Sequence, residues 1–125
     1  MKNTRYYKGY HNGGIMDCND DTISLCPFVT AQRLIQGKWA ILIMHYLSEE
    51  TLRFNELQRK MPKMTHATLS NQLKQLEAEG LIIRTEFAQI PPKVEYRLSD
   101  IGKEFQIVLN SICDWGMKYI DYQNS

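Results

Sequence analysis

Apolar residues in the middle of the chain recur first at helical spacing and then at strand spacing. Three leucines fall at i, i+4 and i+7 and predict one apolar stripe of an amphipathic helix: Leu69, Leu73 and Leu76. Thr65 suits the N-cap, because its hydroxyl can accept a hydrogen bond from a first-turn N–H. Gly80 suits the left-handed position that ends a helix. We therefore expect a helix over residues 66–79.

A shorter helix should precede this one, with a turn between them. Asn55 can cap a helix that continues to Met61, with Leu57 on its inner face. Pro62 then forces a turn, because proline cannot continue a helix. The order helix, short turn, helix over about residues 55–79 predicts a helix-turn-helix. In that motif the second helix enters the major groove of DNA and the first crosses the phosphate backbone.

The chain that follows alternates apolar and polar residues, as a strand does. Residues 81–87 predict one strand and residues 93–98 a second, and the segment between them contains Pro91-Pro92. The inward-facing residues of the second strand should be Val94, Tyr96 and Leu98. A hairpin directly after a helix-turn-helix is the wing of a winged helix, so the predicted wing spans about residues 81–98. The expected fold class is mainly α with a small β-hairpin.

Two further helices are expected before the helix-turn-helix. Pro27 suits the first turn of a helix, and Gly37 should end it. Residues 38–47 are apolar nearly all round, which predicts a buried central helix. We expect His45 within it to be a packed core residue, because no second ligand lies at metal-binding spacing.

The last helix should begin after the N-cap Ser99 and continue over about residues 100–122. It carries two adjacent apolar stripes. One stripe would pack on the helix's own domain, but two need a further surface, most simply a second copy of the chain. The residues expected at this dimer interface are Ile112, Cys113, Trp115, Gly116, Tyr119 and Ile120. A two-fold dimer presents two reading helices to DNA, so the predicted partner is an inverted-repeat operator in double-stranded DNA.

The outer face of the helix over residues 66–79 is unusual for a solvent face. It carries small, amide-bearing and basic side chains, which suit base edges because an amide pairs with adenine and a methyl group touches thymine. Between Arg53 and Lys74 five cations accompany one carboxylate, a local excess typical of a DNA-facing surface. The candidate DNA-binding residues are Arg53, Lys63, Thr65, His66, Ala67, Ser70, Asn71, Lys74, Gln75, Lys93 and Arg97, with Asn71 as the first-choice base reader.

Each of these assignments has an alternative. The helix can be an ordinary amphipathic helix, because helix-turn-helix geometry also occurs in proteins that bind no DNA. In the wing, Lys93 and Arg97 can simply pair with Glu86 and Glu95 across the strands, which contributes a few tenths of a kcal/mol.

Composition places the chain among globular proteins. Its 125 residues are 43% hydrophobic and 23% charged, with a net charge of +1, and they suffice for one domain. No apolar run approaches the ~20 residues of a membrane span, and the first residues lack the apolar core of a signal peptide. We expect a cytoplasmic protein without membrane contact. Residues 1–21 contain no helical or strand period and predict a flexible arm, and residues 22–125 the folded domain.

The sequence offers no catalytic or metal-binding constellation. Its three histidines fall in the arm, the central helix and the reading helix, and no phosphate-binding loop, paired carboxylates or nucleophile motif accompanies them. We therefore expect neither an enzyme nor a cofactor or metal site. The three cysteines form no C-x-x-C pair, and their expected state in a reducing compartment is the free thiol.

Four segments together carry a family resemblance: CPFVTAQRLIQGKWAILIMHYL, LRFNELQRKMPKMTHATLSNQLKQLEAEGLI, PPKVEYRLSDIGKEF and a late CDWG. Over about Cys26 to Tyr119 the chain resembles the HxlR-type winged-helix transcriptional regulators, within the MarR-like superfamily. The resemblance implies a small homodimeric bacterial regulator of transcription. It also implies a recognition helix at residues 66–79 and dimerisation through the N- and C-terminal helices.

Several members of that family sense oxidants, electrophiles or aldehydes through a cysteine near the start of the domain. Cys26, in the Cys-Pro motif, matches that position, and Cys18 in the arm is a candidate resolving or intersubunit thiol. The helix dipole at Cys26 favours the reactive thiolate. The alternative is a buried cysteine that acts as a small hydrophobe. Two rival functions remain: a regulator gated by a small molecule among Trp39, Tyr46 and Trp115, and a winged-helix protein-interaction module without DNA binding.

Overall fold

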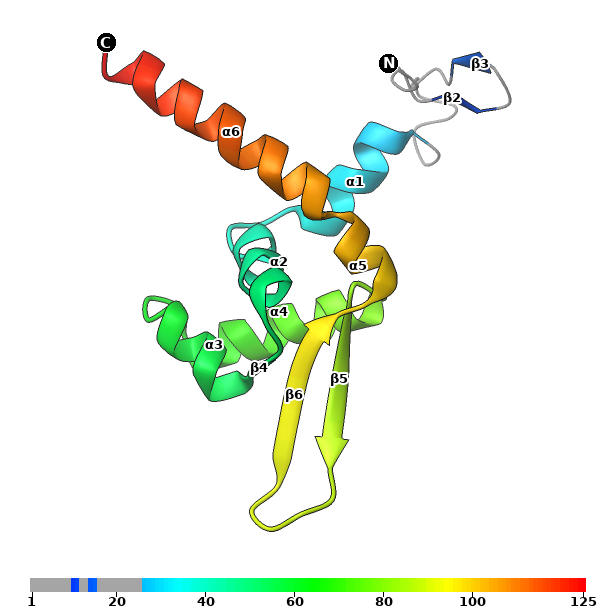
Figure 1. Cartoon of the computed structure of the whole chain (residues 1–125), viewed down its shortest axis with the longest axis vertical. Coiled ribbons are helices and arrows are strands. Elements are labelled where there is room, and N and C mark those ends of the chain that lie inside the picture. Colours follow the sequence, from blue (N-terminus) through cyan, green and yellow to red (C-terminus); the bar gives the residue numbers. More distant parts are fainter. Residues whose placement is uncertain (1–9, 12–13, 16–25) are drawn as a thin grey trace. The chain divides into compact units, whose positions relative to one another are not determined.

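The structure, a computed structural model, describes residues 10–11, 14–15 and 26–125 (Figure 1). The chain forms two compact units, Met1–Gln36 and Gly37–Ser125. The described part of the first unit contains a two-residue antiparallel pair, β2 (Tyr10–His11) with β3 (Gly14–Ile15), and the helix α1 (Pro27–Ile35). Pro27 opens α1 as expected, but the strand pair was not predicted. Most of the predicted arm over residues 1–21 lies outside the described residues, and the division at residue 22 stays a prediction.

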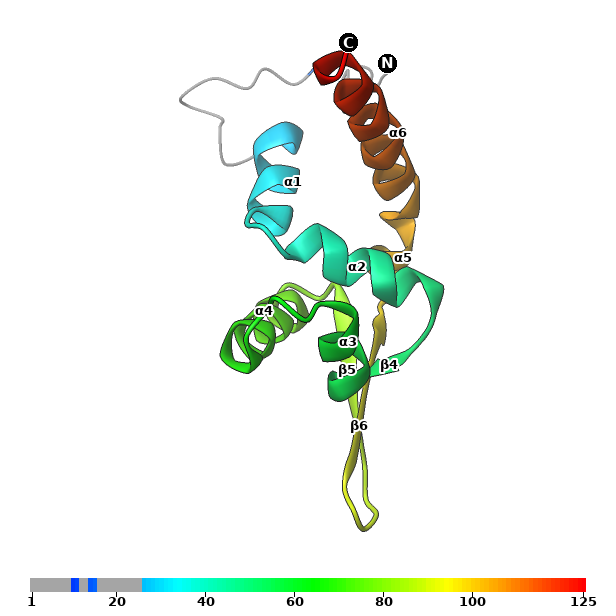
Figure 2. The ribbon, with the colours of Figure 1, turned by 90° about the vertical axis from the view of Figure 1, so that its left-hand side faces the viewer.

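The second unit contains the helix-turn-helix and the hairpin. In chain order its elements are α2 (Ala40–Glu49), β4 (Leu52–Arg53), α3 (Phe54–Lys60), α4 (His66–Ala78), β5 (Ile82–Phe87), β6 (Lys93–Leu98), α5 (Asp100–Glu104) and α6 (Gln106–Gln123). Figure 2 shows α2 lying across α3 and α4, with the β5–β6 hairpin projecting beyond them. The mainly helical fold with a small β-hairpin is confirmed. None of the helices among the described residues is long and apolar enough to cross a membrane.

The core of this unit lies where α2, α3 and α4 meet the base of the hairpin. The completely buried residues of the three helices are Ile43, Met44, Leu57, Leu69 and Leu73. Ile82 closes the core from the first strand. Burial of one such side chain stabilises the fold by about 1.5–3 kcal/mol. The predicted leucine stripe therefore sets which face of α4 points outward.

The caps of α4 agree with the sequence. The Thr68 N–H donates to Thr65 Oγ1 over 3.1 Å at the start of the helix. At its end Gly80 has φ +81°, and the Leu81 N–H donates to the Leu76 carbonyl over 3.0 Å. Because glycine adopts this conformation without steric cost, α4 ends where the pattern predicted.

The start of α3 differs from the prediction. Arg53, not Asn55, is the N-cap, and its N–H donates to the Glu56 carboxylate over 2.7 Å. Arg53 is held in extended backbone because β4 pairs with β6, so the helix begins immediately after it. The turn to α4 is closed by the Gln58 amide, which donates to the Met64 carbonyl over 2.5 Å.

The hairpin belongs to a three-stranded antiparallel sheet of order β4-β6-β5. The strand β4 was not predicted, because two residues are too short for a visible period. In the register Ile82 pairs with Leu98, Arg84 with Tyr96, and Leu52 also with Tyr96. Paired residues share a face of a sheet. This face therefore holds the buried Leu98 at its base and Arg84 farther out.

The predicted C-terminal helix is broken. Phe105 separates α5 from α6, although Ser99 caps α5 as expected by accepting from the Gly102 N–H over 3.1 Å. The Ser99 hydroxyl also donates to the Gly80 carbonyl over 2.6 Å. A Cβ at residue 102 would overlap the Leu81 carbonyl oxygen, so glycine is required there. These contacts fix the position of α5 at the end of the sheet. The chain then changes direction at Phe105, between α5 and α6.

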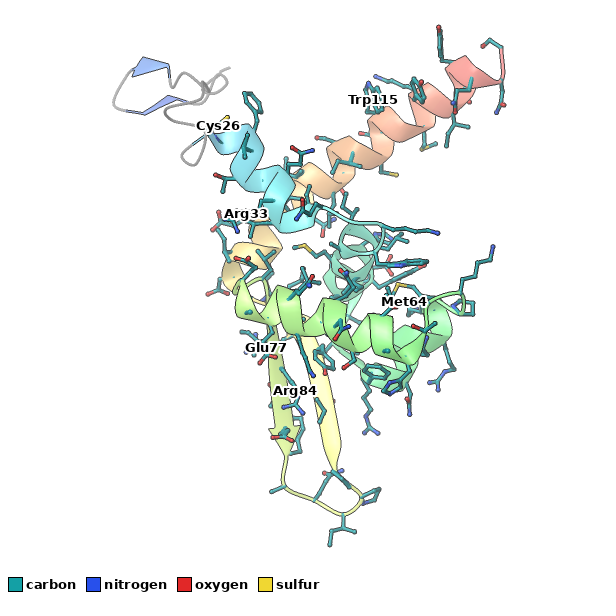
Figure 3. All side chains as sticks on the ribbon, turned by 180° about the vertical axis from the view of Figure 1, so that it is seen from behind. Cys26, Arg33, Met64, Glu77, Arg84 and Trp115 are labelled. Atoms are coloured by element: carbon teal, nitrogen blue, oxygen red, sulfur yellow. The ribbon has the colours of Figure 1, made fainter. Side chains whose placement is uncertain are left out.

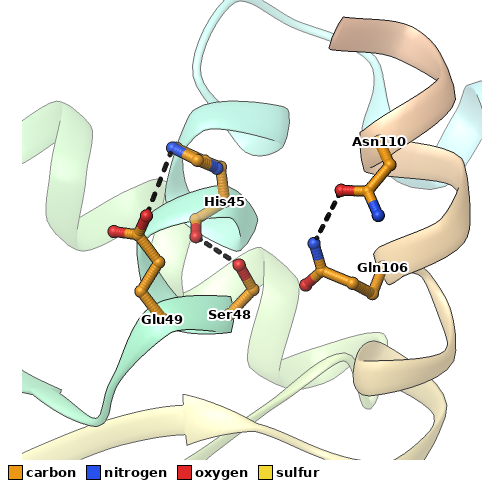
Figure 4. A network of polar contacts seen from close by, with 5 residues as sticks. All are labelled: His45, Ser48, Glu49, Gln106 and Asn110. Carbon is orange, nitrogen blue, oxygen red and sulfur yellow. Dashed lines mark hydrogen bonds and ion pairs between the residues drawn. The ribbon is translucent and has the colours of Figure 1, made fainter. Parts of the chain in front are cut away.

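The expectation that His45 is buried is wrong. His45 is exposed, and its Nε2 lies 4.0 Å from the Glu49 carboxylate on the surface of α2 (Figure 4). The reason is that α2 buries only one face, formed by Ala40, Ile43, Met44 and Leu47. On α6 only Leu109 is buried; the residues predicted at the dimer interface, Trp115 included, are exposed in the single chain apart from the half-buried Gly116, and that interface stays a prediction. The Gln106 amide donates to Asn110 over 3.0 Å near the start of that helix.

Candidate nucleic-acid interface

The outer face of α4 presents the predicted base-reading side chains to solvent. His66, Ala67, Asn71, Lys74 and Gln75 are exposed, and Ser70 is half-buried. Within the described part of the chain, the Asn71, Lys74 and Gln75 side chains make no hydrogen bond or ion pair. Their amide and ammonium groups are thus available to a partner. The geometry suits base edges, because the groups stand opposite the three buried leucines on a rigid, capped helix.

The residues around the start of α4 form a polar margin beside that face. Arg53 and Lys63 are exposed, as a role in holding phosphates requires. The Thr65 hydroxyl accepts from the Thr68 N–H and donates to Thr68 Oγ1 over 2.9 Å, so it is engaged in capping. The His66 ring lies 4.5 Å from the Phe54 ring, which joins the beginnings of α3 and α4.

Two clefts flank the hairpin, and charged residues line both. The first has a volume of about 480 Å³ and lies between α3 and β6; its lining residues are Arg53, Phe54, Asn55, Glu56, Arg59, Pro92, Lys93 and Val94. The second has a volume of about 310 Å³ and lies between α4 and the hairpin; its lining residues are Ser70, Lys74, Glu77, Arg84 and Tyr96. Both clefts contain cations that project toward solvent, and neither contains the Trp39, Tyr46 and Trp115 set.

The predicted wing cations do not lie on the side of α4. Lys93 and Arg97 occupy the face of β6 opposite that of Tyr96, as their alternation along the strand requires. Lys93 Nζ lies 3.2 Å from the Glu95 carboxylate on the same strand and 4.8 Å from the centre of the Phe87 ring. The ion pair is therefore within one strand, not across the hairpin. Arg97 is exposed.

Arg84 and Tyr96 are cleft residues that sequence reasoning missed. Arg84 Nη2 lies 3.3 Å from the Glu86 carboxylate, and hydrogen bonding to Tyr96 and then to Glu86 raises the pKa of Arg84 above its ordinary value. Figure 3 shows Glu77 on α4 and Arg84 on the hairpin, on the side that α4 faces. The sequence did contain a signal for this pair. If the two predicted strands are paired symmetrically about Ile90, Arg84 falls opposite Tyr96, as it does in the structure.

The cysteines differ from the expected free thiols. Cys26 is the N-cap of α1, only 1% exposed, and disulfide-bonded. Cys113 on α6 is an exposed free thiol. The remaining cysteine, Cys18, lies outside the described residues. Among the described residues no group of His, Cys, Asp or Glu could hold a metal ion. A disulfide at Cys26 is therefore compatible with the fold, although a reducing compartment favours the free thiol.

A capped helix-turn-helix, an exposed polar face on its second helix and an adjoining hairpin define a winged-helix DNA-binding protein. The family model of the HxlR-like helix-turn-helix matches residues 34–124. The chain therefore belongs to the HxlR-like helix-turn-helix family. It is a transcriptional regulator, not an enzyme.

Known relatives agree with this assignment. An HTH-type transcriptional regulator of Halalkalibacterium halodurans is 46% identical over 93 residues, which cover 74% of this chain and 82% of that protein. One from Methanothermobacter thermautotrophicus is 38% identical over 119 residues, which cover 95% of this chain and 88% of that protein.

Solved structures with this fold include redox regulators. The reduced form of the redox regulator HypR is 32% identical, with a TM-score of 0.76, and the match covers 79% of this chain and 98% of that one. The oxidised form of HypR is 34% identical, with a TM-score of 0.70, over 74% of this chain and 96% of that one. The diamide-treated YodB of Bacillus subtilis is 29% identical, with a TM-score of 0.65, over 75% and 94% of the two chains.

Proposed function

We propose that the chain is a dimeric, sequence-specific DNA-binding regulator whose α4 reads an inverted-repeat operator. The observation that carries the proposal is the outer face of α4, where amide and ammonium groups are exposed and uncommitted. In a helix-turn-helix these groups point into the major groove. Such groups have natural partners on base edges, where an amide can pair with adenine and a methyl group can touch thymine.

The proposed roles follow from side-chain chemistry. Asn71 pairs with a base, most simply the two hydrogen-bonding groups of an adenine, and Ser70, Ala67 and Lys74 contact neighbouring positions. His66 and Gln75 border that set. Arg53, Lys63 and Thr65 hold phosphates at the start of α4. The Thr65 hydroxyl already accepts the capping hydrogen bond from the Thr68 N–H, so it would contact a phosphate in addition to capping the helix. Lys93 and Arg97 supply positive charge from the other face of the hairpin.

The second copy is proposed because α6 leaves a large apolar face uncovered. Trp115 is 64% exposed and its ring lies 5.1 Å from that of Tyr119, in a stacked arrangement. Ile112, Ile120 and Tyr122 are exposed on the same helix. Monomeric proteins rarely expose so continuous an apolar surface. A two-fold pairing of α6 helices would cover both copies at once, with Cys113 and Gly116 in the contact, and would place the half-sites about 34 Å apart.

Thiol sensing is the proposed input. Two thiols, Cys26 and Cys18, would lose two electrons and two protons to an oxidant such as diamide and form a disulfide, and a reductant would reverse the step. The disulfide bond at Cys26 and the likeness to redox regulators support this proposal. Cys26 lies at the beginning of α1, so its oxidation state can alter the segment before the winged helix.

Selection of bound duplexes from a random pool tests the proposal. The selection is run at one near-physiological salt concentration with reduced and with diamide-treated protein. Enrichment of a two-fold repeat by either form would support a dimeric sequence reader, and a change on oxidation would support thiol sensing. Absence of enrichment under both conditions would instead favour a protein-interaction module or a regulator that needs a small-molecule ligand. Thermal shift against candidate metabolites then separates these two.

A further inference from the structure

The cleft between α4 and the hairpin lies where DNA geometry requires a phosphate strand. A protein helix in the major groove is bordered on each side by one sugar-phosphate backbone. The hairpin lies beside α4 and projects beyond it (Figure 2). With α4 in the groove, the hairpin must therefore pass over one of these backbones. The space between the two elements is the cleft of about 310 Å³.

We propose that this cleft, lined by Ser70, Lys74, Arg84 and Tyr96, is the seat of that phosphate strand, with Arg84 as its principal ligand. The proposal rests on DNA binding by α4 and extends it with a contact site on the wing. Lys74 and Arg84 approach the cleft from two different elements, one from the helix and one from β5. A phosphate held between them would fix the position of α4 relative to the wing.

Arg84 is suited to this role by its surroundings. Its guanidinium is a planar, permanently charged group that can bind two phosphate oxygens at once. Tyr96 is buried, pairs with Arg84 on the same face of the sheet and lines the same cleft. The Glu86 partner is 69% exposed, at a separation of 3.3 Å. An exposed ion pair of this kind is weak, so a phosphate can replace the carboxylate.

One lining residue opposes an anion. Glu77 is exposed on α4, three positions after Lys74, and contributes a carboxylate to the cleft. Its repulsion of a phosphate would reduce the affinity that Arg84 and Lys74 provide. The seat therefore predicts opposite effects for two charge removals: Arg84→Gln should weaken DNA binding and Glu77→Gln should strengthen it. A merely structural role of the cleft predicts no such opposition.

The test measures binding of one enriched duplex by fluorescence anisotropy over a range of salt concentrations. Lys103→Gln is the matched control, because it removes one positive charge from an exposed position on α5 outside the cleft. We expect Arg84→Gln to lower affinity about tenfold and to reduce the slope of log K against log salt by about 0.9 per phosphate released. Lys103→Gln should leave both nearly unchanged.

Neutral methylphosphonates locate the strand. One phosphate of the duplex is replaced at a time, and affinity is measured for each replacement. At one position per half-site the replacement should lower the affinity of the unmodified protein but not that of the Arg84→Gln variant. If the unmodified protein binds DNA with steep salt dependence but Arg84→Gln and Lys103→Gln have the same affinity and salt slope, the proposed phosphate site is refuted and the proposed function is not. Altered base selectivity in Arg84→Gln would also overturn it, since a phosphate contact carries no sequence information. A protein that binds no duplex would overturn the seat together with the proposed function.

Discussion

Replacement of Trp115 by alanine is the strongest test of the proposed dimer. The side chain is 64% exposed in the single chain, so a second copy must cover it if α6 forms the interface. A tryptophan can bury about 200 Å², so roughly 130 Å² per copy would leave water on pairing. At ~25 cal/mol per Å² this corresponds to about 3 kcal/mol per copy and about 6 kcal/mol per dimer, as an upper bound.

Since each 1.4 kcal/mol changes an equilibrium constant tenfold, Trp115→Ala should raise the dimer Kd by about a hundredfold to ten-thousandfold. Sedimentation velocity over a series of protein concentrations measures that constant. Asp114→Ala is the control, because this exposed residue lies on the polar side of the same helix. The folded monomer should keep its thermal stability, since Trp115 packs little on its own chain. A dimer unchanged by Trp115→Ala would refute the assignment of this face, and an unmodified protein that stays monomeric would refute the dimer.

Three further predictions concern base reading, sensing and packing. Asn71→Ala should cost ~1–3 kcal/mol on the preferred duplex and relax selectivity at one position, whereas Lys63→Ala should weaken all duplexes alike; equal losses on every duplex from Asn71→Ala would mean that α4 is oriented differently. Cys26→Ser should leave DNA binding by the reduced protein intact and abolish its response to diamide in the same assay; a preserved response would exclude Cys26 as the sensor. Gly102→Ala should lower stability to chemical denaturation by about 1–3 kcal/mol, because its Cβ would overlap the Leu81 carbonyl oxygen; an unchanged midpoint would show that α5 shifts freely.

Local sequence signals were sufficient for much of the fold. The leucine stripe, Thr65 and Gly80 predicted α4 with its bounds and its outward face, because capping and helical period act over a few residues. The two strands of the wing were predicted for the same reason, since alternation is visible within six residues. Membership of the winged-helix class followed from the order of these elements.

Contacts between distant segments decided the rest. Arg53 caps α3 because β6 holds β4, and α5 is directed by the approach of Gly102 to Leu81; neither partner is close in sequence. His45 is exposed because α2 buries only the face formed by Ala40, Ile43, Met44 and Leu47, which the sequence of a helix that is apolar nearly all round does not reveal. The pairing of Arg84 with Tyr96 beside α4 also exists only in the assembled sheet. Periodicity thus specified which elements form, whereas the positions at which they meet set the caps, the helix break and the cleft.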